Sequence, residues 1–133
     1  MAVVADTHAI IWYITEPNKL SNNAFIALEK AANDGDFIYL SAISLVEICY
    51  LVEKGRLPAI VLQRLTEVLT EPEAEIAIVP LDLAIGLTIQ NLDRDTVPDM
   101  PDRIIAATAY HLKLPLITRD QKIQALQNIR TIW

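Results

Sequence analysis

Four acidic residues of this chain stand where a predicted strand gives way to a helix: Asp6, Glu47, Asp102 and Asp120. In a parallel α/β sheet these transitions gather along one edge, at the carboxyl ends of the strands. Carboxylates crowded at one edge repel one another unless a cation offsets their charge, and hard divalent ions prefer oxygen ligands. The spacing therefore predicts an acidic pocket able to bind Mg²⁺ or Mn²⁺.

A site made of carboxylates and a metal ion suits phosphodiester hydrolysis, because that reaction needs no nucleophile from the protein. The metal polarises a phosphoryl oxygen and lowers the pKa of a bound water, and a carboxylate can accept the proton of that water. The chain has no Gly-rich phosphate loop ending in Lys-Ser/Thr, no Gly-x-Ser-x-Gly element and no Cys/His cluster with zinc spacing. These absences argue against an NTPase, a serine hydrolase and a zinc protein.

Each of the four acids also has a simpler explanation in helix capping. Asp6 and Asp120 could cap the helices that follow them, since Asp is a favoured N-cap residue. Glu47 lies three residues after Ser44, which is a capping-box spacing. Asp102 could occupy a first helical turn, where a negative charge complements the helix dipole. Capping is the commoner role for any one of them, whereas the joint placement of all four at one edge favours a site.

The elements that must position these acids are read from apolar runs, turn residues and caps. Strands alternating with helices predict an α/β fold in which a central parallel sheet of four to five strands carries helices on both faces. At 133 residues the chain suits a single domain, spanning residues 1–133. The predicted strands are residues 2–5, 37–40, 76–79 and 116–118, with a final edge strand at 129–133. The predicted helices are residues 7–15, 22–33, 44–54, 58–69, 81–92 and 102–111, with a short one starting at 120.

The charge balance bears on the partners. Asp and Glu number 17 against 11 Lys and Arg, so the formal net charge is −6, which taken alone speaks against a nucleic-acid binder. That objection weakens if several acids hold cations. With no apolar run of about 20 residues and no signal peptide, we expect a cytoplasmic protein without membrane contact. The single cysteine, Cys49, lies in an apolar run and is expected to be a buried structural thiol.

Four short motifs, in this order, resemble those of PIN-domain nucleases, and specifically the VapC-type toxins of bacterial toxin–antitoxin pairs. Each motif is weak alone, but four in the family's order are a strong signal. With the closing residues 131–133, the resemblance covers nearly the whole chain. The motifs are VADTHA at residues 4–9, LSAISLVEI at 40–48, PDRIIAA at 101–107 and LITRD at 116–120.

The resemblance implies a metal-dependent endoribonuclease that uses Mg²⁺ or Mn²⁺, is inhibited by a cognate antitoxin and frequently forms homodimers. Its acidic site carries over onto Asp6, Glu47, Asp102 and Asp120, as catalytic residues and metal ligands. Asp6 and Asp102 are the firmest metal ligands, and Asp120 could hold the metal through water. Asp99 is a possible supporting residue and ranks below Asp102, because only Asp102 directly opens the predicted helix.

Five neighbouring residues are candidates for support or for RNA contact. Thr7 and Thr118 could bond to ligand oxygens or metal-bound waters, or could simply begin helices. His8 could contact a substrate phosphate, although a partly buried structural histidine is the safer interpretation. Arg103 and Arg119 flank two of the proposed ligands and could steer a phosphate backbone, or could only neutralise the neighbouring acids.

Two other functions fit parts of the pattern. A metal-dependent phosphatase acting on small phosphoesters would share the acidic edge, but a phosphoenzyme mechanism favours Asp-x-Asp after the first strand, where this chain has Asp6-Thr7-His8. A catalytically inactive PIN-like binding module is the second alternative, and the presence of all four acids argues against it. The sequence therefore favours a toxin ribonuclease that cuts RNA.

Overall fold

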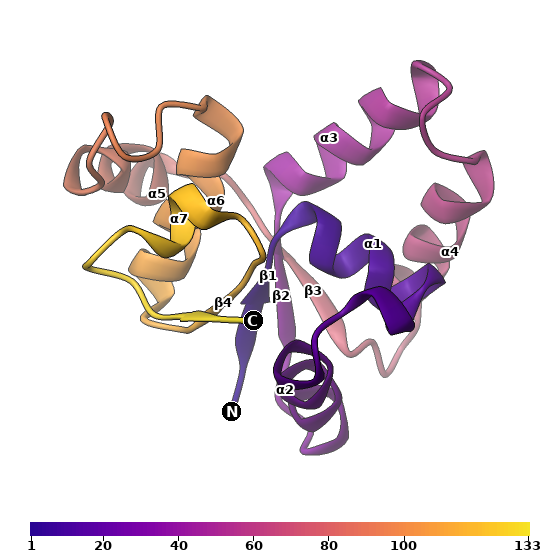
Figure 1. Ribbon diagram of the computed structural model, residues 1–133. Coiled ribbons are helices and arrows are strands. Elements are labelled where there is room, and N and C mark those ends of the chain that lie inside the picture. The colour runs from indigo at the N-terminus through magenta and orange to yellow at the C-terminus, as the bar shows by residue number, and fades with distance from the viewer.

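Five strands form the centre of the protein in the computed structural model, which describes residues 1–133. Their order is β3-β2-β1-β4-β5, and each neighbouring pair is parallel (Figure 1). The predicted fold class, an α/β protein with a parallel sheet of four to five strands, is confirmed. The strands are β1 (Val3–Ala5), β2 (Ile38–Ser41), β3 (Ile76–Val79), β4 (Leu116–Ile117) and β5 (Thr131–Ile132).

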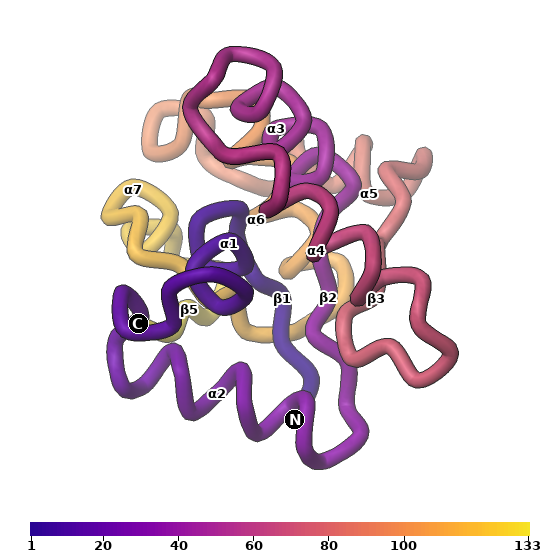
Figure 2. The backbone as a smooth tube through the Cα atoms, turned by 90° about the vertical axis from the view of Figure 1, so that its right-hand side faces the viewer, coloured from indigo at the N-terminus to yellow at the C-terminus, as the bar shows by residue number.

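Helices connect successive strands and cover both faces of the sheet, as predicted (Figures 1 and 2). Short 3-10 helices continue two of the connections, at Pro17–Lys19 (η1) and Ile89–Asn91 (η2). The α-helices are α1 (Thr7–Thr15), α2 (Asn22–Asn33), α3 (Ala42–Glu53), α4 (Ala59–Thr70), α5 (Leu83–Thr88), α6 (Met100–Leu112) and α7 (Gln121–Gln124). None of them is long and apolar enough to cross a membrane.

The central strand β1 separates two hydrophobic cores. Alternate residues of a strand point to opposite faces, so Val3 and Ala5 pack with α1, α2 and α4, whereas Val4 packs with α5, α6 and α7. All three are fully or almost fully buried, which explains why the strand is continuously apolar. Burying a Val, Leu or Ile side chain contributes about 1.5–3 kcal/mol. Both cores therefore hold the carboxyl end of β1 in a fixed position.

The helix that carries Glu47 begins earlier than predicted. Ser41 is the N-cap of α3, and its Oγ accepts a hydrogen bond from the backbone N–H of Ile43 at 3.3 Å. Ser44 instead lies inside the helix and is fully buried. The predicted capping box between Ser44 and Glu47 is therefore wrong, because β2 runs directly into its own cap. Glu47 has no capping role to explain its presence.

The helix that carries Asp102 also begins earlier than predicted. Asp99 is the N-cap of α6, and its Oδ2 accepts a hydrogen bond from the backbone N–H of Asp102 at 3.1 Å. Proline is tolerated in a first helical turn because its missing N–H would have no partner there. Pro101 therefore sits inside α6 rather than ending the preceding loop.

Two further expectations need correction. The predicted helix 81–92 is shorter, because α5 ends at Thr88 and η2 follows it. Cys49 is half-buried rather than buried. It follows Ile48, which faces the core, and successive helical residues are turned by about 100°. That rotation carries the thiol to the flank of α3.

Candidate active site

The carboxyl edge of the sheet brings together the four acids predicted from the sequence and adds Asp99. Figure 1 shows α1 and α3 beginning side by side above the strands, with α6 and α7 across from them. The carboxylates lie close enough to raise one another's pKa: Asp102 responds to Asp99, Asp120 and Glu47, and Asp6 responds to Asp120. Residues from four separate segments therefore form one acidic cluster.

Asp6 forms the buried floor of this cluster and is 8% exposed. Its Oδ1 accepts a hydrogen bond from the backbone N–H of Ala9 at 2.8 Å, so it caps α1 as one interpretation proposed. Burial raises the pKa of Asp6, against the lowering effect of a hydrogen bond from Thr118. Asp6 therefore both caps α1 and belongs to the acidic cluster.

Glu47 reaches the cluster from the second turn of α3 and is positioned by Thr7. The Thr7 hydroxyl donates a hydrogen bond to Glu47 Oε1 at 2.7 Å, and its oxygen lies 2.9 Å from the Ser44 hydroxyl oxygen. Burial raises the pKa of Glu47, and the hydrogen bond from Thr7 opposes that rise. Thr7 thus orients a carboxylate and leaves Oε2 of Glu47 for another ligand.

Asp102 is the most strongly perturbed of these acids. Partial burial, followed by the nearby carboxylates of Asp99, Asp120 and Glu47, raises its pKa to about 7. Asp102 was preferred to Asp99 as a site residue because it was expected to open the helix. In the structure, Asp99 and not Asp102 caps α6. Asp99 also raises the pKa of Glu47, so it belongs to the same cluster.

Asp120 joins the cluster from the start of α7. Its Oδ1 accepts hydrogen bonds from the backbone N–H groups of Lys122 at 2.8 Å and Ile123 at 3.1 Å. Its own backbone N–H donates to the fully buried Thr118 hydroxyl at 3.1 Å. Because Thr118 also hydrogen bonds to Asp6, it links the acids that follow β1 and β4.

Two cavities open at this edge. A polar cavity of about 650 Å³ is lined by Asp99, Asp102, Arg119 and Asp120, together with Val97, Pro98, Gln121 and Lys122. Beside it lies a more apolar groove of about 410 Å³. The sequence analysis does not predict this groove. The pattern that indicates it is a pair of apolar residues of α3, one helical turn apart and next to Glu47. Its lining includes Thr7, Glu47, Val46, Tyr50 and Met100.

The three residues predicted to contact RNA have different surroundings. Arg119 lines the polar cavity. Arg103 points elsewhere, since its Nη2 donates to the carbonyl oxygens of Ile89 at 2.9 Å and Leu92 at 3.1 Å, which holds η2 against α6. Its predicted RNA contact is replaced by a structural role. His8 is exposed rather than partly buried, and its ring lies 5.7 Å from that of Trp12.

The residues present fit a hard divalent cation held by few protein ligands. No three acidic, His or Cys side chains lie close enough to enclose a metal ion. The cluster offers only carboxylate oxygens, which suit Mg²⁺, Ca²⁺ or Mn²⁺ rather than a thiolate-binding metal. Mg²⁺ in particular keeps several waters and binds through one or two carboxylates plus substrate phosphate oxygens. The carboxylates around Asp102 repel one another and raise its pKa, and a bound cation would offset that repulsion.

This parallel sheet with an acidic cluster at its carboxyl edge defines a PIN-domain protein. A family model described as the PIN domain matches residues 3–129. Ribonuclease VapC22 of Mycobacterium tuberculosis is 31% identical over 134 residues, covering 98% of each chain. The chain belongs to the PIN-domain family, whose ribonucleases generally depend on divalent metal ions.

Solved structures of low sequence identity share the fold. VapBC2 from Rickettsia felis, bound to a DNA fragment from its promoter, has a chain that matches with a TM-score of 0.74 at 19% identity, covering 98% of this chain and 97% of that one. A toxin–antitoxin complex from Klebsiella pneumoniae matches with a TM-score of 0.62 at 23% identity, covering 92% and 90%. Both matches support the architecture over nearly the full chain.

Proposed function

We propose that this protein is a metal-dependent endoribonuclease that hydrolyses RNA phosphodiester bonds as the toxin of a toxin–antitoxin pair. The observation that carries the proposal is the cluster of Asp6, Glu47, Asp99, Asp102 and Asp120 at one sheet edge. The name of its relative VapC22, a ribonuclease, supports RNA as the substrate. A site with only carboxylates favours hydrolysis by water over a covalent protein intermediate.

Asp6 and Asp102 are the residues that we assign as principal ligands of Mg²⁺ or Mn²⁺, with Glu47 and Asp120 completing the site through metal-bound water. When bound, the cation would polarise a phosphoryl oxygen and lower the pKa of a water. Two residues orient these ligands. Thr118 hydrogen bonds to Asp6 and to the backbone of Asp120, and the Thr7 hydroxyl fixes Glu47.

Proton transfer falls to the carboxylates that the hydrogen bonds leave available. Glu47 accepts from Thr7 through Oε1, so its Oε2 can accept a proton from the attacking water. Asp99 keeps one oxygen engaged with the backbone of α6 and adds negative charge beside Asp102. That charge favours a bound cation, which is why we include Asp99 in the site.

A cognate antitoxin is the proposed protein partner. The structural neighbour from Klebsiella pneumoniae is described as a toxin–antitoxin complex, and the one from Rickettsia felis is VapBC2, which supports this assignment. We further propose that the protein acts as a homodimer in the cytoplasm. A second chain would bring additional Lys and Arg side chains near the acidic cluster. These cations would help a protein of net charge −6 to hold RNA.

The deciding experiment is cleavage of a panel of structured RNAs with Mg²⁺, Mn²⁺ or EDTA, comparing the wild type with Asp6→Asn. We expect cleavage that needs metal and falls by at least about a hundredfold in the variant. Asp34→Asn is the matched control, because Asp34 is an exposed acid at the end of α2. Cleavage that survives in Asp6→Asn or in EDTA would contradict the proposal. Hydrolysis of p-nitrophenyl phosphate without RNA cleavage would instead support the small-phosphoester phosphatase.

A further inference from the structure

A cation stacked on an aromatic ring forms one wall of the acidic site. The guanidinium carbon of Arg119 lies 4.8 Å from the centre of the Trp12 ring. On its other sides the Trp12 ring contacts His8, at a centroid distance of 5.7 Å, and Trp133, at 6.0 Å. These residues come from α1, from the turn after β4 and from the chain end after β5. Segments distant in sequence thus meet around Trp12.

Arg119 makes no ion pair, although it precedes Asp120 and lines a cavity with three carboxylates. The two ion pairs of the protein lie elsewhere, between the amino terminus and Asp36 and between Lys19 and Glu16. No hydrogen bond from the Arg119 side chain to another protein group is formed either. An arginine paired with a carboxylate would have its charge neutralised and its donors occupied. The face of Trp12 attracts the cation while leaving its N–H donors free.

We propose that Trp12 is a positioning residue of the nuclease: its ring holds the Arg119 guanidinium at the cavity wall, where that group binds an RNA phosphate. This inference rests on the proposed ribonuclease function. A planar guanidinium can offer two parallel N–H groups to a phosphate, and stacking on an aromatic ring fixes its plane. The stack therefore supplies orientation as well as charge.

Both partners of the stack are rigidly connected to the acids that they serve. Trp12 is half-buried on α1, whose first turn is capped by Asp6, and it packs against the core shared by α1, α2 and α4. Arg119 lies between Thr118 and Asp120, which are hydrogen bonded to each other. A phosphate bound by Arg119 would thus lie at a fixed position relative to Asp6 and Asp120. That arrangement suits a phosphate adjacent to the one that is cleaved.

The stack also explains how an acidic pocket admits a polyanion. Asp99, Asp102 and Asp120 line the cavity, against the cations Arg119 and Lys122. Arg119 is the cation that has a fixed aromatic support. Its charge would remain available to RNA even when the acids are unpaired.

The test measures KM and kcat for a fluorescent RNA that the wild type cleaves, in Trp12→Leu, Arg119→Gln and the double variant. Trp12→Leu should raise KM about three- to fivefold, as expected for loss of an exposed cation–π contact, with kcat changed less than about twofold. Arg119→Gln should raise KM about tenfold, because a charge-assisted bond to phosphate is lost. In the Arg119→Gln background, Trp12→Leu should raise KM no further.

Two comparisons separate positioning from general destabilisation. Tyr13→Leu is the matched control, since Tyr13 is the next residue of α1, is half-buried against the same core and donates a hydrogen bond to Glu29 at 2.7 Å. It should lower the melting temperature without raising KM. Trp12→Phe keeps a ring and the packing, so it should recover part of the wild-type KM. It also carries the test if Trp12→Leu does not fold.

Each outcome decides between the two proposals. Wild-type cleavage together with an unchanged KM in the folded Trp12 variants would overturn the positioning role alone. Multiplicative effects of Trp12→Leu and Arg119→Gln on KM would do the same, because they would show that Trp12 acts without Arg119. A wild type that neither binds nor cleaves RNA would overturn the proposed function, and this inference with it.

Discussion

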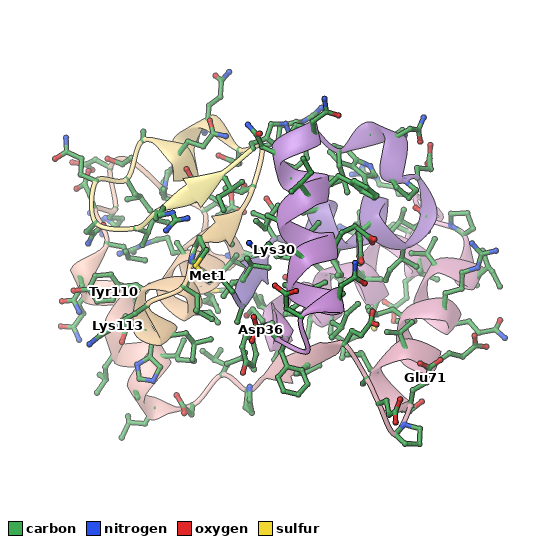
Figure 3. All side chains as sticks on the ribbon, turned by 90° about the horizontal axis from the view of Figure 1, so that it is seen from below. Met1, Lys30, Asp36, Glu71, Tyr110 and Lys113 are labelled. Carbon is green, nitrogen blue, oxygen red and sulfur yellow. The ribbon has the colours of Figure 1, made fainter.

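The two edges of the sheet use acidic residues in opposite ways. At the carboxyl edge, Asp102 is crowded by Asp99, Asp120 and Glu47, and its pKa rises to about 7. At the amino edge, Asp36 forms an ion pair of 2.7 Å with the amino group of Met1. Figure 3 views this second edge and labels Asp36 and Met1, the two partners of this ion pair. Asp36 at the amino edge is paired with a cation, whereas Asp102 at the carboxyl edge is surrounded by other acids.

The burial of the acids also differs between the two edges. The amino edge has a cavity of about 440 Å³ with no carboxylate in its lining, and a second cavity of about 390 Å³ lined by Asp36 and by the exposed Glu73 and Glu75. The cavity at the carboxyl edge is lined by three carboxylates. The acids of the carboxyl edge also include the buried Asp6 and the half-buried Glu47, and folding stability alone disfavours burying charge. This difference in burial supports the carboxyl edge as the candidate site.

Substituting one acid at each edge should give the largest contrast. Asp102→Asn should lower the rate of RNA cleavage by at least about a hundredfold, because it removes a proposed metal ligand. Asp36→Asn, the same change at the amino edge, should leave the rate within about twofold of wild type. Steady-state cleavage of one RNA in Mg²⁺ measures both. Comparable losses in the two variants would mean that the crowded edge is not the active site.

Metal should stabilise the protein through the crowded edge. Mg²⁺ or Mn²⁺ at a hundred times its dissociation constant stabilises the folded state by about 2.7 kcal/mol if it binds only that state. For a domain of this size, each kcal/mol corresponds to a rise in melting temperature of about 3–6 °C. Thermal unfolding in EDTA and in millimolar metal measures the effect. Asp102→Asn should reduce this rise, whereas Asp36→Asn should preserve it; a rise that is equal in all three proteins would point to a metal site elsewhere.

The sequence predicts the edge at which the acids meet. The carboxyl ends of parallel strands lie along one edge of the sheet whatever the order of the strands. The apolar runs at residues 2–5, 37–40 and 116–118 identify strands, and an acid that follows a strand lies at its carboxyl end. Glu47 and Asp120 reach the same edge by this rule, although nothing local relates one to the other. Long-range placement is therefore predictable for these acids, whereas Asp102 follows α5 and η2 rather than a strand and reaches the edge through the position of α6.

Helix starts are less predictable, because two possible caps lie three residues apart at α3 and again at α6. Ser41 and Ser44 are both acceptable N-cap residues, and so are Asp99 and Asp102. The choice depends on where the preceding segment leaves the sheet, which is decided by tertiary packing. The cap of α6 is therefore Asp99, three residues before the helix start that the sequence predicts.

Side-chain direction along a helix is the second limit. Arg103 follows Asp102 in sequence and was therefore expected at the site, but successive helical residues are turned by about 100°. That rotation directs Arg103 to the carbonyl oxygens of η2. Arg119 precedes Asp120 in an irregular turn, where no such rotation applies, and it does line the cavity. Sequence neighbours of a site residue share its location only when the local backbone permits it.

The smallest expected effect is a pH dependence of stability in the metal-free protein. The pKa of Asp102 is near 3.8 in the unfolded chain and about 7 in the folded one, so between these values the folded state binds more protons. The free energy of unfolding should therefore fall as pH rises from about 4.5 to 7. Burial raises the pKa of Asp6 and Glu47 as well, which adds to the fall. Because Asp102 is half-exposed, solvent screening reduces its contribution to about 1 kcal/mol.

Urea unfolding in EDTA at pH 4.5, 5.5, 6.5 and 7.5, at constant ionic strength, measures this slope. Asp102→Asn should flatten it, because an amide does not titrate, whereas the exposed acid variant Asp34→Asn should keep it. Saturating Mg²⁺ should abolish it, since metal-bound carboxylates stay ionised and the folded and unfolded states then bind similar numbers of protons over this pH range. A slope that is the same in Asp102→Asn and in the wild type would show that the crowding of charge at the carboxyl edge is weaker than its geometry implies. The contrast between the two edges would then rest on cleavage and metal binding alone.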